Sequence, residues 1–157
     1  MKKLIISIIA ALALLATLTG VALAGQKELS INGTLQAVET PDFTNLPIMT
    51  STASGSGIAT QLGRYTISWE VEVNLETLTG TGTGQFVAAN GDSLYTVGTG
   101  QATPTDEPNV FHVVENLIIT GGTGRFAGAS GNITTDRIVD LTTGVTSGTI
   151  SGNIVLP

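Results

Sequence analysis

Apolar and polar side chains alternate without exception over residues 64–73. Between the polar residues at 64, 66, 68, 70 and 72 stand Tyr65, Ile67, Trp69, Val71 and Val73. A period of two is that of a β-strand with one buried face and one solvated face. After residue 24, no segment of helical length has apolar residues at the i, i+3, i+4 and i+7 spacing of an amphipathic helix. The chain is therefore expected to fold as an all-β domain.

The rest of the chain is rich in Thr, Val, Ile and Gly, which is typical of short strands joined by tight turns. Strands are expected at residues 28–38, 54–60, 64–73, 80–89, 93–102, 110–120, 131–140 and 145–155. Eight strands with hairpin connections and no helix predict a closed antiparallel barrel, which leaves no exposed sheet edge.

Several local features refine this barrel. Asn90-Gly91 favours a two-residue type I′ hairpin turn. Residues 110–120 are continuous enough in Val, Leu and Ile to be buried on most of both faces. Residues 39–53, which contain two prolines and no periodicity, are expected to form a surface loop, and residues 103–109 a second one.

The N-terminus has the three parts of a secretory signal peptide. A basic start at Lys2-Lys3 is followed by an apolar run to Leu18 and by Ala22-Leu23-Ala24. The alternative is a retained membrane anchor, but an Ala-x-Ala end has no use in one. Cleavage after residue 24 would leave residues 25–157 as a single domain. The protein is therefore expected to be secreted or periplasmic, with no membrane attachment after cleavage.

Charge and composition exclude several classes of partner and chemistry. Without Lys2 and Lys3, four basic residues stand against twelve acidic ones, and such a surface repels nucleic acid. The chain has no Cys and a single His, His112, which excludes thiol catalysis, thiolate metal sites and metal sites built on several imidazoles. No metal and no cofactor are expected.

Residues 120–131, Thr-Gly-Gly-Thr-Gly-Arg-Phe-Ala-Gly-Ala-Ser-Gly, gather small residues around one cation and one aromatic ring. A phosphate-binding loop would need Lys-Ser/Thr and a helix after the glycines, where this chain has Arg-Phe and an expected strand. We instead expect glycines with positive φ at a tight corner, a phenylalanine that plugs one barrel end and an arginine paired with a carboxylate. The residues of this structural corner are Gly121, Gly122, Gly124, Arg125, Phe126 and Gly131. Residues 82–92 echo residues 122–132, so a tandem repeat is another reading.

Residues 57–65, 89–92 and 121–131 together resemble small secreted bacterial proteins related to the allene oxide cyclase and dirigent barrels. The family's Gly-Gly-Thr-Gly-x-Phe-x-x-Ala-x-Gly corner looks like residues 121–131. The resemblance implies an eight-stranded antiparallel barrel with an elongated interior cavity, often assembled as a homodimer or homotrimer. The polar residues with which the plant proteins steer cyclisation or radical coupling have no matching positions here, so that chemistry is not carried over.

Glu115 is the weak catalytic candidate. It shares a strand face with the apolar residues that alternate between 111 and 119, where desolvation would raise its pKa and equip it for proton transfer. The alternatives are a strand bulge or an ion pair with Arg137 or Arg64. His112 falls on the opposite face, so it is expected to be exposed or a local hydrogen-bond donor.

Tyr65, Trp69 and Tyr95, together with Glu115, are the candidate ligand-binding residues. The three aromatic side chains would either line a cavity or fill the core. Glu70 and Glu72 lie about 7 Å apart on a strand, a spacing similar to that of glycosidase carboxylates, but a solvated barrel exterior explains them more simply.

These observations favour a secreted, acidic β-barrel that binds a small hydrophobic ligand or serves as a structural or interaction module. The alternative is a cyclase or isomerase that acts on a hydrophobic substrate inside the barrel, with Glu115 as acid or base. A polar cavity lining would favour the enzyme, whereas a filled apolar interior would favour neither.

Overall fold

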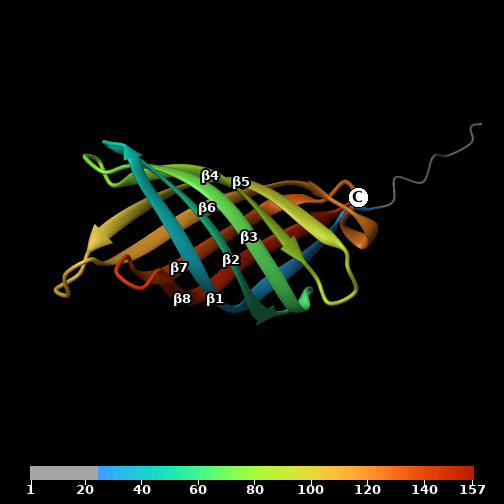
Figure 1. The fold of residues 1–157 in the computed structure, drawn as a ribbon. Helices are drawn as coiled ribbons and strands as arrows, with labels where there is room; N and C mark the ends of the chain where they lie inside the picture. The colour runs from blue at the N-terminus through green and yellow to red at the C-terminus, as the bar shows by residue number, and fades with distance from the viewer. Residues whose placement is uncertain (1–24) are drawn as a thin grey trace, which may run out of the picture.

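Eight β-strands run along the molecule, and a single-turn 3-10 helix connects two of them (Figure 1). The computed structural model describes residues 25–157, so the predicted signal peptide of residues 1–24 lies outside the described part. Within that part, no helix has the length and hydropathy needed to cross a membrane. The elements are β1 (Lys27–Asn45), β2 (Ile48–Ala59), β3 (Gly63–Asn74), β4 (Thr79–Val87), β5 (Ser93–Pro104), β6 (Val110–Gly122), η1 (Gly124–Phe126), β7 (Ser130–Asp140) and β8 (Val145–Leu156).

Each strand pairs antiparallel with its neighbours in the sequence, and β8 pairs with β1, which closes the barrel. The predicted eight-stranded antiparallel closed barrel is therefore confirmed. Because each connection joins two adjacent antiparallel strands, the connections alternate between two ends. The plugged end carries residues 60–62, 88–92 and 123–129 and the C-terminus, and the cavity end carries residues 46–47, 75–78, 105–109 and 141–144.

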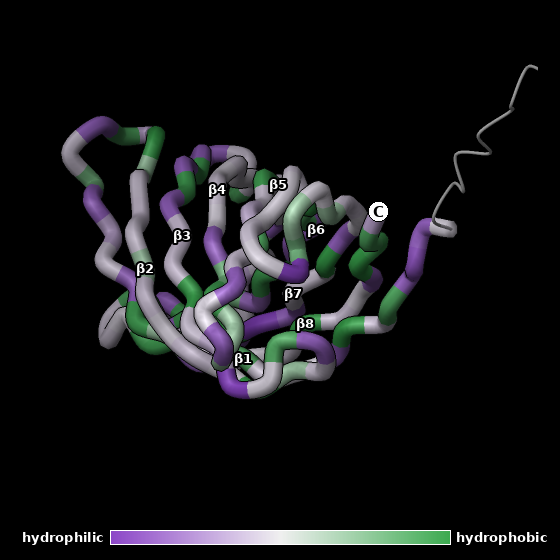
Figure 2. The backbone as a smooth tube through the Cα atoms, turned by 90° about the vertical axis from the view of Figure 1, so that its right-hand side faces the viewer, coloured by the Kyte–Doolittle hydropathy of each residue, from purple (hydrophilic) through white to green (hydrophobic). Residues whose placement is uncertain are grey.

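Side chains alternate between the interior and the outer surface along each strand. In β1, Ile31, Leu35 and Ala37 are buried, whereas the even-numbered residues between them are exposed. In β3, Tyr65 and Ile67 are buried by the same alternation. Figure 2 shows the strands arranged around a ring, with hydrophobic and hydrophilic stretches alternating along the tube.

Large apolar side chains fill the plugged end. Phe126 of η1 is 1% exposed and belongs to a buried cluster with Leu62, Phe86 and Leu94. The ring centroids of Tyr65 and Phe86 lie 5.6 Å apart within this cluster. The 3-10 helix lies beside the C-terminus in Figure 1. The buried cluster fills the interior at this end.

The expectation of a surface loop over residues 39–53 is wrong. β1 continues to Asn45 and β2 begins at Ile48, so most of that segment is a β-hairpin. Val38 is the last β1 residue paired with β8, and the Glu39 amide still donates to the Gly144 carbonyl oxygen; beyond Glu39 the strand is paired with β2 alone. A proline is tolerated where one side of a strand is free, which explains Pro41. The hairpin also extends the inward alternation of β1 to Glu39.

The predicted type I′ turn at Asn90-Gly91 is also wrong, although β5 does return antiparallel to β4. The connection spans residues 88–92, and the Ala88 amide donates to the Asp92 carbonyl oxygen at 2.8 Å. A type I′ turn needs positive φ at both central residues, whereas only Gly91 has it in this connection, at +89°.

β6 is buried on one face only, which corrects the expectation for residues 110–120. Ile118 is 54% exposed on the outer surface, while Ile119 and Val113 are buried inside. A closed barrel without a covering layer exposes the outer face of every strand, so an apolar run does not imply two buried faces.

Candidate functional site

The half of the barrel toward the cavity end is hollow. Its cavity has a volume of about 100 Å³ and reaches from Phe86 and Trp69 to the half-buried Leu75, Leu78 and Leu141 in the turns. Most of the remaining lining is apolar, from residues such as Leu35, Met49, Ile67, Val73, Val113 and Val139. The barrel is therefore solid at one end and hollow toward the other.

Glycines form one wall of the cavity. Gly80, Gly82 and Gly84 of β4 and Gly98 and Gly100 of β5 all line it, because they occupy the inward positions of their strands. These positions contribute backbone only, so the interior is wider there than it would be with side chains.

The close approach of neighbouring side chains keeps these positions as glycine. A Cβ on Gly100 would lie 2.7 Å from Cγ of Glu115, and one on Gly98 would collide with the Leu117 side chain. Larger residues at these two positions would push β6 side chains into the cavity. The glycine wall therefore also fixes where Glu115 lies.

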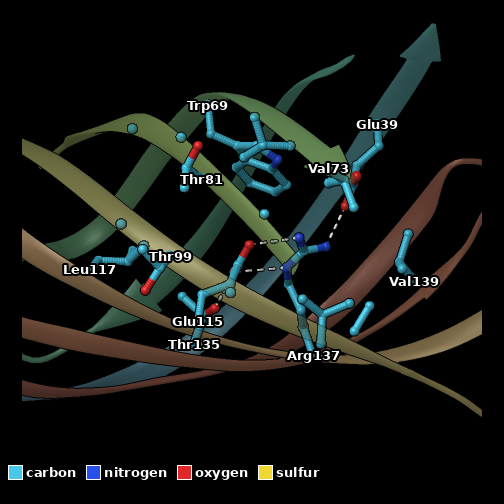
Figure 3. A pocket seen from close by; sticks show the side chains of 18 of the residues that line it. Glu39, Trp69, Val73, Thr81, Thr99, Glu115, Leu117, Thr135, Arg137 and Val139 are labelled. Atoms are coloured by element: carbon cyan, nitrogen blue, oxygen red, sulfur yellow. Dashed lines mark hydrogen bonds and ion pairs between the residues drawn. The ribbon is translucent and has the colours of Figure 1, made fainter. Parts of the chain in front are cut away.

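Three charged side chains meet inside the apolar cavity (Figure 3). Arg137 of β7 donates from Nε and Nη2 to the two carboxylate oxygens of Glu115 on β6, at 3.0 and 2.9 Å. Its Nη1 forms an ion pair with Glu39 of β1. Arg137 and Glu39 are 5% and 6% exposed, so the cluster is shielded from solvent. We call these three residues the charged cluster.

Hydroxyl groups complete the hydrogen bonding of the charged cluster. Thr135, directly opposite Glu115 in the β6–β7 register, donates to its carboxylate. Arg137 Nη1 donates to Thr146 Oγ1 at 3.0 Å, and Ser51 Oγ donates to Glu39 at 3.3 Å. All three hydroxyl residues are buried. The surrounding strands thus hold each charged side chain in one position.

The charged cluster keeps Glu115 ionised. Burial by itself would raise the pKa of the Glu115 carboxyl, but hydrogen bonds from Arg137, its positive charge and the Thr135 hydroxyl outweigh burial and lower that pKa. Burial would likewise lower the pKa of the Arg137 guanidinium, and the carboxylates of Glu115 and Glu39 raise it instead. The expected rise in the pKa of Glu115 is therefore wrong, and the expected alternative, an ion pair with Arg137, is what the structure contains.

Trp69 covers the charged cluster from β3. The Arg137 guanidinium lies over the indole, 5.3 Å from the ring centroid, within the range of a cation–π contact. The buried indole Nε1–H has no hydrogen-bond partner within residues 25–157. Trp69 and Glu115 are thus the two predicted ligand-binding residues that the cavity brings together.

The two tyrosines lie elsewhere. Tyr65 is buried beside Phe86 and donates its hydroxyl to the Thr34 carbonyl at 2.8 Å, outside the cavity lining. Tyr95 is 40% exposed on the outer surface, so its predicted place in the cavity is wrong. An outward strand position explains it, because Thr96 next to it is the inward residue.

The other polar residues that the sequence analysis considered, apart from Glu115 and Arg137, are also on the outer surface. His112 Nε2 lies 2.7 Å from Asp136 Oδ1, and both side chains are exposed. Glu70 and Glu72 are exposed on β3, as a solvated exterior predicts. Glu39 was missed, because its strand was expected to end at Val38; one further step of the inward alternation from Leu35 and Ala37 would have found it.

The glycine-rich corner has a structural role in this geometry. Gly121, Gly124 and Gly131 have φ of +145°, +56° and +123°, whereas Gly122 has no positive φ and is instead packed against Phe126. The Arg125 guanidinium has no carboxylate at ion-pair distance within the described residues and lies 4.6 Å from the Phe126 ring centroid. The expected ion pair of Arg125 is thus replaced by a cation–π contact, while its backbone amide donates to Asp92.

The sequence matches no family model and no curated protein. Among solved structures, the chain is similar to the pterocarpan synthase dirigent protein GePTS1, with a TM-score of 0.57 and 15% sequence identity. The match covers 83% of this chain and 89% of that chain. At so low an identity the likeness concerns the fold alone. The protein therefore has a dirigent-like β-barrel fold, in agreement with the resemblance seen in residues 57–65, 89–92 and 121–131.

Proposed function

We propose that the barrel binds a small, mainly apolar ligand in the cavity beside Trp69 and the charged cluster. The observation that carries this proposal is the uneven filling of the interior, which is solid around Phe126 and hollow behind the glycine wall. An apolar cavity of about 150 Å³ is large enough to bind benzene, and the cavity here is of the same order. Small-molecule sites are typically such concave, mainly apolar cavities with a few fixed polar groups.

Trp69 makes the proposal directly testable, because it is the only tryptophan of the chain and lines the cavity. Titration of the protein with small cyclic hydrocarbons and alcohols should change the intrinsic fluorescence in a saturable way. A matched pair of variants on β7 supplies the control. Val139→Phe fills the cavity and should abolish the response, whereas Ile138→Phe adds the same ring on the outer surface and should leave it intact. Equal responses from both variants would place any binding outside the cavity.

A cyclase or isomerase is the second candidate, and the charged cluster is the observation that favours it. Fixed charges in an apolar site can stabilise charge that develops in a transition state. Glu115 would act electrostatically in such a reaction, since both of its oxygens are bonded and its pKa is lowered. Chromatography of any ligand that is retained on purification distinguishes the two roles. One compound supports binding alone, whereas two interconverting isomers of equal mass support the enzyme.

We also propose that the protein acts outside the cytoplasm, because residues 1–24 have the pattern of a cleaved signal peptide. N-terminal sequencing of the protein from its host should begin at Gly25. An N-terminus at Met1 would contradict this proposal.

A further inference from the structure

We propose that the ligand of this cavity is an organic cation, a protonated amine on a small apolar body. This inference rests on the proposed binding function and names the chemical class of its ligand. Three separate features support it: the charge balance of the charged cluster, its unused hydrogen-bonding capacity, and the distribution of charge between the two ends of the barrel.

The charged cluster has more negative than positive charge. It joins the two carboxylates of Glu39 and Glu115 to the single guanidinium of Arg137, so the ionised cluster has a formal charge of −1. Among the described residues, Arg137 is the one basic side chain that lines the cavity. An unbalanced buried charge is unfavourable in an apolar medium, and a cationic ligand would neutralise it.

The same carboxylates still have free acceptor positions. An ionised carboxylate offers about four lone-pair positions, so the pair offers about eight. Glu39 and Glu115 together accept five hydrogen bonds, from Arg137, Thr135 and Ser51. An ammonium group has three donors and no acceptor, which matches this remaining capacity.

Arg137 offers little to an anionic ligand. Nε, Nη1 and Nη2 make four hydrogen bonds with Glu115, Glu39 and Thr146, which uses four of the five guanidinium N–H groups. A carboxylate ligand would find no free pair of donors and would meet two carboxylates of like charge. The cavity therefore discriminates against anions.

Charged surface residues are divided between the two ends of the barrel. Near the cavity end lie six acidic residues, Asp42, Glu72, Glu76, Asp106, Glu107 and Asp140. The basic residues of the described part other than Arg137 are Lys27, Arg64 and Arg125, and all three lie at the plugged end, where only two acidic residues of that part, Glu28 and Asp92, also lie. A ligand that enters at the cavity end thus crosses a negative potential, which attracts cations and repels anions.

The test compares three ligands of nearly the same shape: cyclohexylmethylammonium, cyclohexylmethanol and cyclohexanecarboxylate. None absorbs near the tryptophan band, so the fluorescence of Trp69 reports each titration directly. At neutral pH and low salt we expect the ammonium ion to bind at least tenfold more tightly than the alcohol, and the carboxylate to bind most weakly.

Two variants locate the effect. Glu115→Gln removes one charge of the cluster and should reduce the preference for ammonium over alcohol to about twofold or less. Asp106→Asn combined with Glu107→Gln, both on an exposed loop, should weaken ammonium binding and its salt dependence without affecting folding. Glu28→Gln combined with Asp92→Asn removes the same net charge at the plugged end and serves as the control.

Each result of these titrations either supports or overturns the proposal of a cationic ligand. Equal or tighter binding of the alcohol than of the ammonium ion would overturn it and leave the proposed binding function standing. Binding of none of the three ligands would count against the proposed function itself, and with it the inference. An ammonium preference that survives both Glu115→Gln and the loop variant would show that the cation binds elsewhere, which also overturns it.

Discussion

Replacement of Arg137 by methionine tests the charged cluster most directly. Methionine keeps much of the apolar length of the side chain and removes the positive charge. The change eliminates three hydrogen bonds to Glu115 and Glu39 and one to Thr146. It leaves two carboxylates in an apolar cavity without a counter-ion, and unpaired buried charges are strongly destabilising.

The expected cost is large and depends on pH. Removal of one partner from a buried ion pair costs about 3–5 kcal/mol of folding free energy. Because two carboxylates are left without a counter-ion, the upper part of that range is expected. In the native protein the pKa of Glu115 is lowered, so its stabilising contribution is present above its unfolded-state pKa and is lost as the pH falls through its folded-state pKa. In the variant, burial without Arg137 raises the pKa of Glu115, and protonation of the carboxylate then removes an unfavourable buried charge. The difference in stability between native protein and variant should therefore be greatest near pH 7 and should shrink as the pH falls through the raised pKa of the variant and on below 4.5, the ordinary pKa of glutamate, to the lowered pKa of the native protein.

Urea unfolding followed by far-UV circular dichroism measures both effects. Arg64→Met, at an exposed position on β3, is the control and should change the free energy of unfolding by less than about 0.5 kcal/mol. A loss of under about 1 kcal/mol in Arg137→Met at neutral pH, or a loss that does not change with pH, would refute the reasoning. A triple variant with methionine at 39, 115 and 137 should recover most of the lost stability, because a whole buried ion cluster can often be replaced by apolar residues at little cost.

Three further outcomes follow from the fold. Phe126→Ala should lower the free energy of unfolding by about 3–5 kcal/mol, since the ring is fully buried, and a loss below about 1 kcal/mol would exclude its role as a plug. Burial raises the pKa of the Tyr65 hydroxyl to about 12, so a spectrophotometric titration should show a late ionisation that is absent in Tyr65→Phe. The stabilisation from the neutral Tyr65 phenol is complete below its unfolded-state pKa of about 10 and is lost as the pH rises through 12. An ionisation near pH 10 that disappears in Tyr65→Phe would contradict this. Gly91→Ala should cost about 1–2 kcal/mol in chemical unfolding, through backbone strain alone, because φ is +89° and no atom lies near the added Cβ; no loss would mean that the turn can change its conformation.

The strand pattern was predictable from the sequence wherever one face is buried and the other solvated. Residues 64–73 in β3 show this, because each inward residue is apolar and each outward one polar. The prediction failed at residues 39–53, where Pro41 and short polar residues lie in a strand that is paired on one side beyond Glu39. It failed again at Ile118, because an apolar residue can face solvent on a barrel without a covering layer. Local composition does not specify which strand edges are free or which faces are covered.

The candidate site was predictable in part for a similar reason. Glu115 and Trp69 stood out because each sits on the inward face of a clear strand, and Arg137 was identified as a possible partner of Glu115. The contribution of Glu39 depends on closure of the barrel, since β1 and β7 approach each other only through β8. Arg137 reaches Glu39 past Thr146, which is paired with Ala37 on one side and Val139 on the other. No pattern within one strand encodes that contact.

The glycine wall and the charged cluster face the same cavity, and neither adds to the stability of the barrel. Glycine in a strand interior gives up packing area, and a buried ion cluster is often no more stable than an apolar replacement. A barrel selected only for stability would fill this half with Ile and Phe, as it does at the plugged end, where Phe126 and Phe86 are buried. The combination of a hollow interior, a wall made of backbone and a charged cluster held by Thr135, Thr146 and Ser51 therefore supports the proposed ligand-binding role. The triple variant tests this role, since a barrel that remains stable without its charges but no longer distinguishes ammonium from alcohol would show that the charges serve recognition.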